Sequence, residues 1–273
     1  RRIGAWPANM ISTAAMCTVV ILRRPEHDWP LLIAANRDEM LARSWLPPAR
    51  HWPDRPDVVA GIDELSGGSW LGVNDHGVAV AVLNRVGSLG PVADKRSRGE
   101  LVLEALDHAD ARDAAGALSD IDPNAYRTFN LVIADNRDAY WLAGRTGAER
   151  IAIEALPAGY SFFTSSDRND PDKPRVDAYL PLFESAEIPD PDSGDWSEWT
   201  RLMSDRTGAS RDEPMCIVSD YGYGTVSCSL IALPKPTPSA LAKWSFAAGR
   251  PDITAFEPVD MSGAEPAGAA GND

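Results

Sequence analysis

The sequence has few residues of the kinds that build disulfide frameworks and metal sites. Its 273 residues include three cysteines, Cys17, Cys216 and Cys228, without a Cys-x-x-Cys spacing, and four histidines scattered without ligand spacing. A disulfide framework and a zinc site are therefore not indicated, and a reducing compartment, the cytoplasm, is expected. We expect no bound metal and no cofactor.

Positive charge is also scarce. Lys and Arg number 26 against 40 Asp and Glu, which gives a formal net charge of −14. A chain this acidic is poorly suited to a phosphate backbone or to an anionic membrane face, so nucleic acid is excluded as a main partner. No segment reaches the roughly 18 apolar residues of a membrane span, and membrane insertion is not expected. The sequence does not fix the oligomeric state.

Apolar residues are plentiful enough to build a core. They make up 44% of the chain, which predicts one globular domain over residues 17–256. Residues 1–16 lack the continuous apolar run of a secretory signal and are interpreted as an N-terminal extension or a mis-start. Residues 257–273 are mostly Pro, Gly, Ala and acidic residues with little to bury, which predicts a disordered tail.

The tripeptide Met16-Cys17-Thr18 suggests a cysteine that becomes an amino terminus. If Met16 is the start and is removed, Cys17 carries both a thiol and a free α-amine, so one residue supplies a nucleophile and a base. The amine has an ordinary pKa of about 7.7–8.0 and the thiol of about 8.5, close enough for proton transfer near neutral pH. Residues 1–16 could equally be a short propeptide, or a retained tail that leaves Cys17 inert by this route.

A hairpin is predicted to bring polar partners to Cys17. Two strand-like runs, Thr18–Leu22 and Leu31–Ala35, are joined by a loop rich in Pro, Asp and Glu, and the second run continues into Asn36-Arg37-Asp38-Glu39. A hairpin returns the end of the second strand to the start of the first. Arg37 can then lower the pKa of the thiol, and Asp38 can accept a hydrogen bond from the α-ammonium. The alternative is a strand that ends in a polar turn with a solvated ion pair.

The remaining chain alternates strand and helix patterns. Residues Leu46–Pro56 are rich in Pro and Trp and predict a surface loop. Apolar residues at helical spacing predict helices, with Ser97 as a cap and Glu100 three residues on for the first of them, and short strand-like runs predict strands. The predicted helices are Arg98–Asp107, Asp110–Leu118, Arg175–Phe183 and Trp196–Asp205. The further predicted strands are Trp70–Val73, Val78–Leu83, Phe129–Ala134, Tyr140–Ala143, Arg150–Ala155, Gly159–Thr164, Met215–Val218, Thr225–Leu233 and Lys243–Ala247.

Met-Cys-Thr followed by Asn-Arg-Asp-Glu resembles the NRDE family, also called the transport and Golgi organization protein 2 family. The segment Gly67–Arg85, which reads GGSWLGVNDHGVAVAVLNR, resembles both that family and the N-terminal-nucleophile acylases of penicillin V and bile salts. The resemblance covers roughly Met16 to Phe256. It implies an α+β fold of four layers, αββα, in which two stacked, mainly antiparallel sheets lie between helical layers, as in N-terminal-nucleophile hydrolases.

The same resemblance suggests the other site residues. Asn84 is the candidate oxyanion donor, because a side-chain amide offers N–H groups without carrying charge; the alternative is a turn-capping Asn. Cys17, Arg37, Asp38 and Asn84 form the candidate catalytic set. Asn36, Trp70 and Ser166 are candidate substrate-binding residues, although a Trp more commonly lies in a core.

Two residues depart from the expected pattern. The acylases have an Asn in the segment that corresponds to Phe163–Asp167, where this chain has Ser165 and Ser166, and a hydroxyl donates one hydrogen bond where an amide donates two. Family members often have Arg where this chain has Val226. Both departures bear on whether the site is active and on its substrate preference.

Three functional hypotheses follow from these residues. The first is a hydrolase that acts on a non-peptide amide, ester or thioester of a small apolar or acyl molecule through an acyl-Cys17 intermediate. The second, which the missing polar residues favour, is a non-catalytic carrier of a hydrophobic metabolite on the same fold, such as haem or an acyl-CoA or lipid, since the resemblance links the family to haem and lipid homeostasis. A scaffold for another protein is a third reading.

Overall fold

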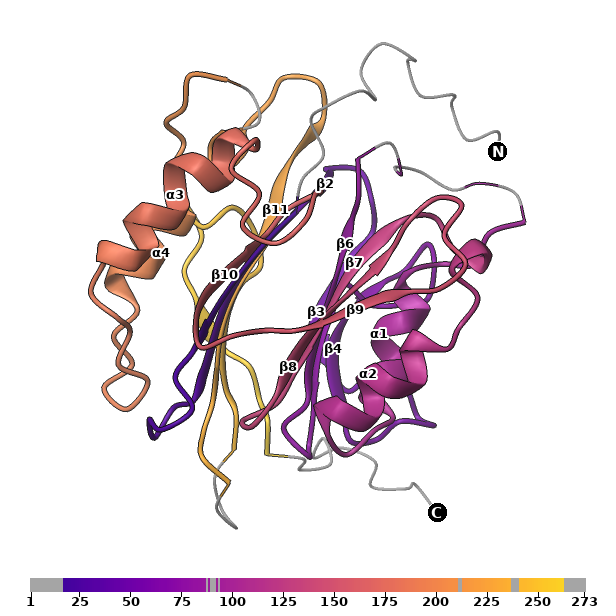
Figure 1. The fold of residues 1–273 in the computed structure, drawn as a ribbon. Coiled ribbons are helices and arrows are strands. Elements are labelled where there is room, and N and C mark those ends of the chain that lie inside the picture. The colour runs from indigo at the N-terminus through magenta and orange to yellow at the C-terminus, as the bar shows by residue number, and fades with distance from the viewer. Residues whose placement is uncertain are drawn as a thin grey trace, which may run out of the picture.

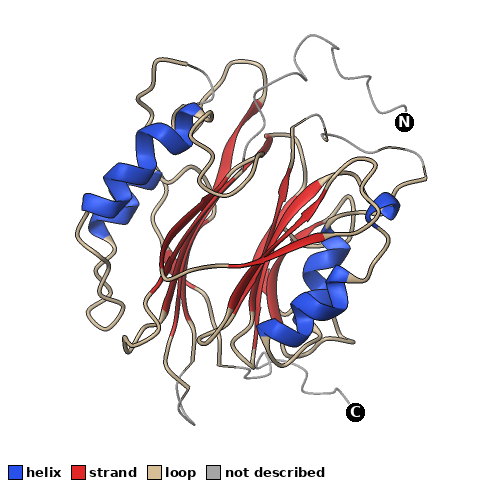
Figure 2. Ribbon diagram, viewed as in Figure 1, coloured by secondary structure: helices blue, strands red, loops and turns tan. Residues whose placement is uncertain are grey.

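The protein is built as four stacked layers, with two β-sheets between two pairs of helices (Figure 1 and Figure 2). The computed structural model describes residues 17–86, 88, 92, 94–210, 213–236 and 241–262. Within both sheets, all neighbouring strands pair antiparallel. The predicted α+β class and αββα layering are confirmed.

The two sheets are built from different parts of the chain. The first sheet has the order β10 (Gly159–Phe163), β1 (Thr18–Arg23), β2 (Leu31–Met40), β11 (Tyr223–Leu233), β12 (Lys243–Ala247) and β13 (Glu257–Pro258). The second has the order β3 (Trp45–Ala49), β4 (Val58–Asp63), β5 (Leu71–Asn74), β6 (Ala79–Asn84), β7 (Phe129–Ala134), β8 (Ala139–Gly144) and β9 (Ala152–Ala155).

Each sheet is covered by one pair of helices on its outer face. Helices α1 (Gly99–Leu106) and α2 (Ala111–Ser119) cover the second sheet, and α3 (Pro174–Ser185) and α4 (Ser197–Met203) cover the first (Figure 1). A short 3-10 turn, Pro123–Ala125, precedes β7. The four predicted helices are confirmed, with boundaries that differ by one or two residues. No helix among the described residues is long and apolar enough to cross a membrane, and the described residues contain no cluster of side chains suited to a metal ion.

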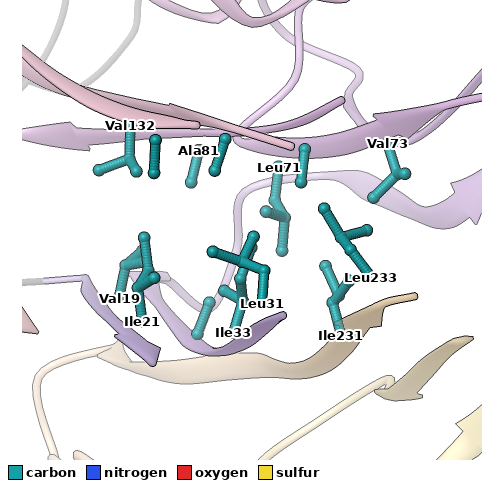
Figure 3. Packing of buried hydrophobic residues seen from close by; sticks show 14 of the residues in the cluster. Val19, Ile21, Leu31, Ile33, Leu71, Val73, Ala81, Val132, Ile231 and Leu233 are labelled. Atoms are coloured by element: carbon teal, nitrogen blue, oxygen red, sulfur yellow. The ribbon is translucent and has the colours of Figure 1, made fainter. Parts of the chain in front are cut away.

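Alternation along the strands divides the apolar residues among three cores. Val19, Ile21, Leu31 and Ile33 point between the sheets, where they meet side chains of the second sheet (Figure 3). The residues between them, such as Leu32, point to α3 and α4 instead. Because successive side chains of a strand point to opposite faces, the same alternation decides which way each polar residue at the end of β2 points.

The loop predicted over Leu46–Pro56 is partly wrong, because β3 forms an edge strand from Trp45 to Ala49. Two consecutive prolines cannot donate to a central ladder, but β3 pairs with β4 alone and its register shifts between Leu46 and Ala49. The sequence patterns also did not predict β4.

Two further predictions near the C-terminus need correction. Met215–Val218 is not a strand, since within it only Val218 forms an isolated bridge, with Gly224. The tail predicted from residue 257 begins with β13, which pairs with β12, because Glu257 and Pro258 add an outer edge opposite Phe246 and Ser245. The predicted extension, residues 1–16, and the tail from residue 263 lie outside the described residues.

Candidate active site

The candidate active site is a cleft of about 440 Å³ to which both sheets contribute. The first sheet provides Cys17, directly before β1, and Arg37, near the end of β2. The second provides Trp70, directly before β5, and Asn84, the last residue of β6. The volume falls within the range of small-molecule pockets. Residues that are far apart in the sequence thus line one cavity.

Cys17 is positioned by the hairpin of β1 and β2. Thr18 pairs with Asn36, which sets Cys17 beside Arg37, and the Cys17 thiol donates to the main-chain oxygen of Asp38 at 3.6 Å. Burial, with a further contribution from the negative charge of Asp38, raises the pKa of the thiol to about 12. In the chain as written, where Cys17 follows Met16, the thiol is therefore protonated at neutral pH.

Asn36 lies on the other face of β2, away from the cleft. Its side-chain amide donates to the main-chain oxygens of Met203, at 3.0 Å, and Met215, at 2.8 Å. These contacts tie β2 to the end of α4 and to the segment before β11. The interpretation of Asn36 as a substrate-binding residue does not fit this position, because strand alternation turns its side chain toward the helical layer.

The Asp38 carboxylate is enclosed on that same helical side. It accepts a hydrogen bond from Thr225 Oγ1 at 2.6 Å and pairs with Arg175 Nη1 at 3.1 Å, and this nitrogen also donates to Thr18 Oγ1 at 2.7 Å. The side chains of Asp38 and Arg175 are fully buried. Burial raises the pKa of Asp38 to about 6, although Arg175 and Thr225 oppose the shift. The described contact between Asp38 and Cys17 joins the thiol to the main-chain oxygen of Asp38. The predicted hydrogen bond from the α-ammonium to Asp38 stays a prediction.

Arg37 points in the opposite direction, into the cleft between the sheets. Its Nη2 donates to Asp63 Oδ2 at 2.8 Å, and its guanidinium lies 4.1 Å from the centre of the Trp70 ring. Asp63, at the end of β4, also pairs with Arg43. Burial lowers the pKa of Arg37, while the charges of Glu39 and Asp63 oppose this. Arg37 is thus a fixed positive charge beside the thiol, held by a carboxylate and an aromatic face.

The Trp70 ring packs directly against the backbone of Gly61, where a larger residue would clash with it. A Cβ atom added at Gly61 would come within 2.3 Å of the Trp70 ring. Trp70 is half-buried and packs against the core between the sheets. It lines the cleft, and its contact with the guanidinium holds Arg37 in place.

Asn84 lines the cleft, whereas Ser166 is not among the lining residues. The loop of Ser166 is held from below by Asn130, whose side-chain amide donates to the main-chain oxygens of Thr164 and Ser166 at 2.9 and 2.7 Å. The hydroxyls of Ser165 and Ser166 are buried and have no hydrogen-bond partner among the described residues.

Val226 lies at a β-bulge, where the register between β11 and β2 shifts between Thr225 and Ser227. Its side chain is buried and is not among the residues that line the cleft. The missing positive charge therefore falls at an irregular strand position, where the bulge changes the direction of the side chain.

Two residues of this site were not found from the sequence. Arg175 had a signal, because it occupies the apolar face of α3 together with Tyr179 and Phe183 at i+4 and i+8, and an arginine there needs a buried partner. Asp63 had none, since the strand that carries it was not predicted.

Comparison with solved structures finds similar proteins. An N-acylethanolamine-hydrolyzing acid amidase orthologue from Caenorhabditis elegans is 14% identical and has a TM-score of 0.55, with 82% of this chain and 95% of that chain covered. A penicillin V acylase from Agrobacterium tumefaciens is 13% identical with a TM-score of 0.45, over 90% of this chain and 98% of that one. The first likeness supports the N-terminal-nucleophile hydrolase fold.

A family comparison covers most of the chain. No curated protein matches at a significant level. Residues 16–234 match the family described as Transport and Golgi organisation 2, a span that begins at the residue before Cys17 and ends just after β11. The chain therefore belongs to the Transport and Golgi organisation 2 family.

Proposed function

We propose that the protein is a cysteine N-terminal-nucleophile hydrolase that cleaves a non-peptide amide, ester or thioester of a small molecule. The observation that carries the proposal is the position of Cys17, which stands at the start of β1 in a cleft that also contains Arg37 and Asn84. The family, the shared fold of an amidase and the pocket volume support it.

The proposed reaction begins with removal of the residues before Cys17, which frees its α-amine. The amine takes the thiol proton, and Sγ attacks the carbonyl carbon of the substrate. The positive charges of the α-ammonium and of Arg37 counter the burial that otherwise keeps the thiol protonated. The oxyanion of the tetrahedral intermediate accepts a hydrogen bond from the Asn84 amide.

Collapse of this intermediate breaks the bond to the leaving group, which takes a proton from the α-ammonium and departs as an amine, alcohol or thiol. The acyl group remains on Sγ as a thioester. Water, deprotonated by the α-amine, then attacks the thioester, and the carboxylic acid and the free thiol are released. In this scheme Asp38 acts through its charge and through its main-chain oxygen, since Arg175 and Thr225 occupy its carboxylate.

A carrier of a hydrophobic metabolite is the second candidate. Two observations favour it: the pKa of the Cys17 thiol is raised to about 12, and hydroxyls at residues 165 and 166 replace the expected amide. A carrier needs neither a thiolate nor an oxyanion donor.

The test compares two forms of the chain, one that begins at Cys17 and one that retains a residue before it. Both are incubated with N-acyl, ester and thioester compounds, and intact mass is measured. We expect an acyl adduct on Cys17 and turnover only when the amine is free. Cys17→Ala should abolish both, whereas Cys216→Ala should abolish neither. Turnover that survives Cys17→Ala would refute the hydrolase, and tight binding without any turnover would favour the carrier.

A further inference from the structure

Tyr223, the first residue of β11, is a buried tyrosine in the wall of the candidate cleft. It is only 5% exposed, and β11 lies beside β2 in the first sheet (Figure 1). Within that pairing Tyr223 is opposite Met40, two residues beyond Asp38. Tyr223 therefore stands at the same end of the sheet as Cys17.

The sequence around Tyr223 fixes the orientation of its ring. Gly222 has a φ of +80°, which favours glycine, and it separates two tyrosines, Tyr221 and Tyr223. Their rings stack with centroids 6.5 Å apart and with an angle of 2° between the planes. The backbone N–H of Tyr223 donates to Ser219 Oγ at 3.4 Å. A ring held in this way presents its hydroxyl to one place.

That place is the main-chain oxygen of Asp38, on which two side chains converge. The Tyr223 hydroxyl donates to this oxygen at 3.1 Å, and the Cys17 thiol donates to it at 3.6 Å. Asp38 lies beyond the last described pair of the β1 and β2 ladder, which is Thr18 with Asn36. The phenol oxygen and the sulfur thus share one acceptor and lie close together.

Tyr223 keeps its proton near neutral pH. Burial raises its pKa well above the ordinary value of 10, the negative charges of Asp38, Cys17 and Glu39 raise the pKa further, and Arg175 opposes them. The hydrogen of a protonated phenol rotates to suit the acceptors around it. Tyr223 is therefore suited to donate a hydrogen bond and not to act as a base.

Loss of the thiol proton changes what the sulfur needs. A thiol donates to a carbonyl oxygen, but a thiolate only accepts, so the sulfur and the Asp38 oxygen then repel each other. The charged groups that act on Cys17 or respond to it are the cations Arg37 and Arg98 and the acidic residues Asp38 and Glu39. A neutral donor close to the sulfur stabilises the thiolate in addition to these charges.

We propose that Tyr223 is a further catalytic residue, whose hydroxyl donates to the Cys17 thiolate. When the α-amine takes the thiol proton, the Tyr223 O–H turns from the Asp38 oxygen to Sγ, and that oxygen accepts from the α-ammonium instead. The phenol proton stays on its own oxygen throughout. As Sγ bonds to the carbonyl carbon of the substrate, the negative charge moves to the oxyanion, and the hydroxyl returns to Asp38.

The proposal rests on the proposed function for the part that Cys17 plays, but stabilisation of the thiolate is measured without turnover. Iodoacetamide labels thiolates, and mass spectrometry follows the labelling rate of the Cys17 peptide against pH in the chain that begins at Cys17. We expect Tyr223→Phe to raise the apparent pKa of the thiol and to lower the labelling rate at neutral pH about tenfold, because a hydrogen bond to an ion is stronger than one to a neutral group. For any compound that is hydrolysed, kcat should fall more than KM changes.

Tyr179→Phe is the matched control. Tyr179 is also buried, and its hydroxyl also donates to a main-chain oxygen at 3.1 Å, that of Thr207, but it does not line the cleft. This variant should leave the labelling rate unchanged. A fluorinated tyrosine at position 223 keeps the ring and makes the hydroxyl a stronger donor, so it should lower the apparent pKa of the thiol. The fluorinated variant decides the question if Tyr223→Phe lowers the melting temperature.

Equal labelling rates in the wild type and Tyr223→Phe, or equal losses in Tyr223→Phe and Tyr179→Phe, would overturn the proposal. Tyr223 would then only join the end of β11 to β2. A thiol pKa that responds to Tyr223 in a chain that hydrolyses none of the compounds would support the contact with the thiolate and count against the hydrolase.

Discussion

The two faces of β2 hold their polar side chains in different surroundings. On the helical face, Asn36 and Asp38 are fully enclosed, and their side chains bind the main chain near α4 and the buried Arg175. On the cleft face, Arg37 lies beside Cys17, and its Nη1 has no hydrogen-bond partner among the residues that the structure describes. Within one tetrapeptide, Asn36 and Asp38 therefore bind the strand to the helical layer, whereas Arg37 faces the cleft.

This division follows from strand geometry alone. Successive side chains of β2 alternate between the two faces, so a contiguous polar motif cannot point its members at one ligand. The enclosed face is expected to determine stability, and the open face is expected to determine chemistry. Substitutions on either side test that separation.

Arg175→Met should have the largest effect on stability. It leaves the buried Asp38 carboxylate without its cation, and removing one partner of a buried ion pair costs about 3–5 kcal/mol. The free energy of unfolding from urea titration measures this. Arg201→Ala is the control, because Arg201 pairs with Glu198 on the exposed surface of α4 and should change stability by less than about 1 kcal/mol. Equal losses in the two variants would show that the enclosed face does not carry the stability.

Asn84→Ala should have the largest effect on the cleft face, given the proposed hydrolysis. Loss of one oxyanion donor typically lowers turnover by about 10²–10³, which corresponds to about 2.7–4 kcal/mol. Asn84 is half-buried in the cleft wall, so the free energy of unfolding should change little. Steady-state turnover and urea titration of the same preparation check both expectations. A loss of stability without a loss of turnover would place Asn84 among the structural residues.

The sequence predicted the fold better than it predicted the contacts of the site. The hairpin that carries Cys17 and Arg37 was predicted because strand periodicity and a polar loop are local signals. Arg175 lies 137 residues from Asp38, and Asp63 lies on a strand with no clear pattern. Such pairings depend on how layers stack, which local periodicity does not encode. Asn36 was named as a candidate substrate-binding residue together with its neighbours, because a motif read as a unit hides the alternation of its side chains.

The raised pKa of Asp38 predicts how the stability contributed by the enclosed face changes with pH. Its pKa in the folded protein is raised to about 6 by burial, whereas the unfolded chain has the ordinary value near 4. Between these values the folded state binds the extra proton, so this contribution is fully present below pH 4 and is lost as the pH rises through 6. The difference in unfolding free energy between the wild type and Asp38→Asn should fall by up to about 1.4 kcal/mol per pH unit over that window. A difference that rises with pH would mean that the Arg175 charge outweighs burial.

The smallest expected effect concerns the contact that holds Arg37 in the cleft. The guanidinium lies over the Trp70 ring, and a partly desolvated cation–π pair contributes about 0.5–2 kcal/mol. A double-mutant cycle of Arg37→Met and Trp70→Leu measures this coupling energy. The loss of the ion pair between Arg37 and Asp63 is already contained in the Arg37→Met variant, so it cancels in the cycle. Lys243 over Trp29 is the matched control, since its ammonium lies 5.0 Å from the ring centre and its side chain is 49% exposed. We expect a larger coupling for Arg37 and Trp70 than for the exposed pair. Equal couplings would mean that the ring supports Arg37 only by filling space, and that Asp63 alone fixes the charge beside Cys17.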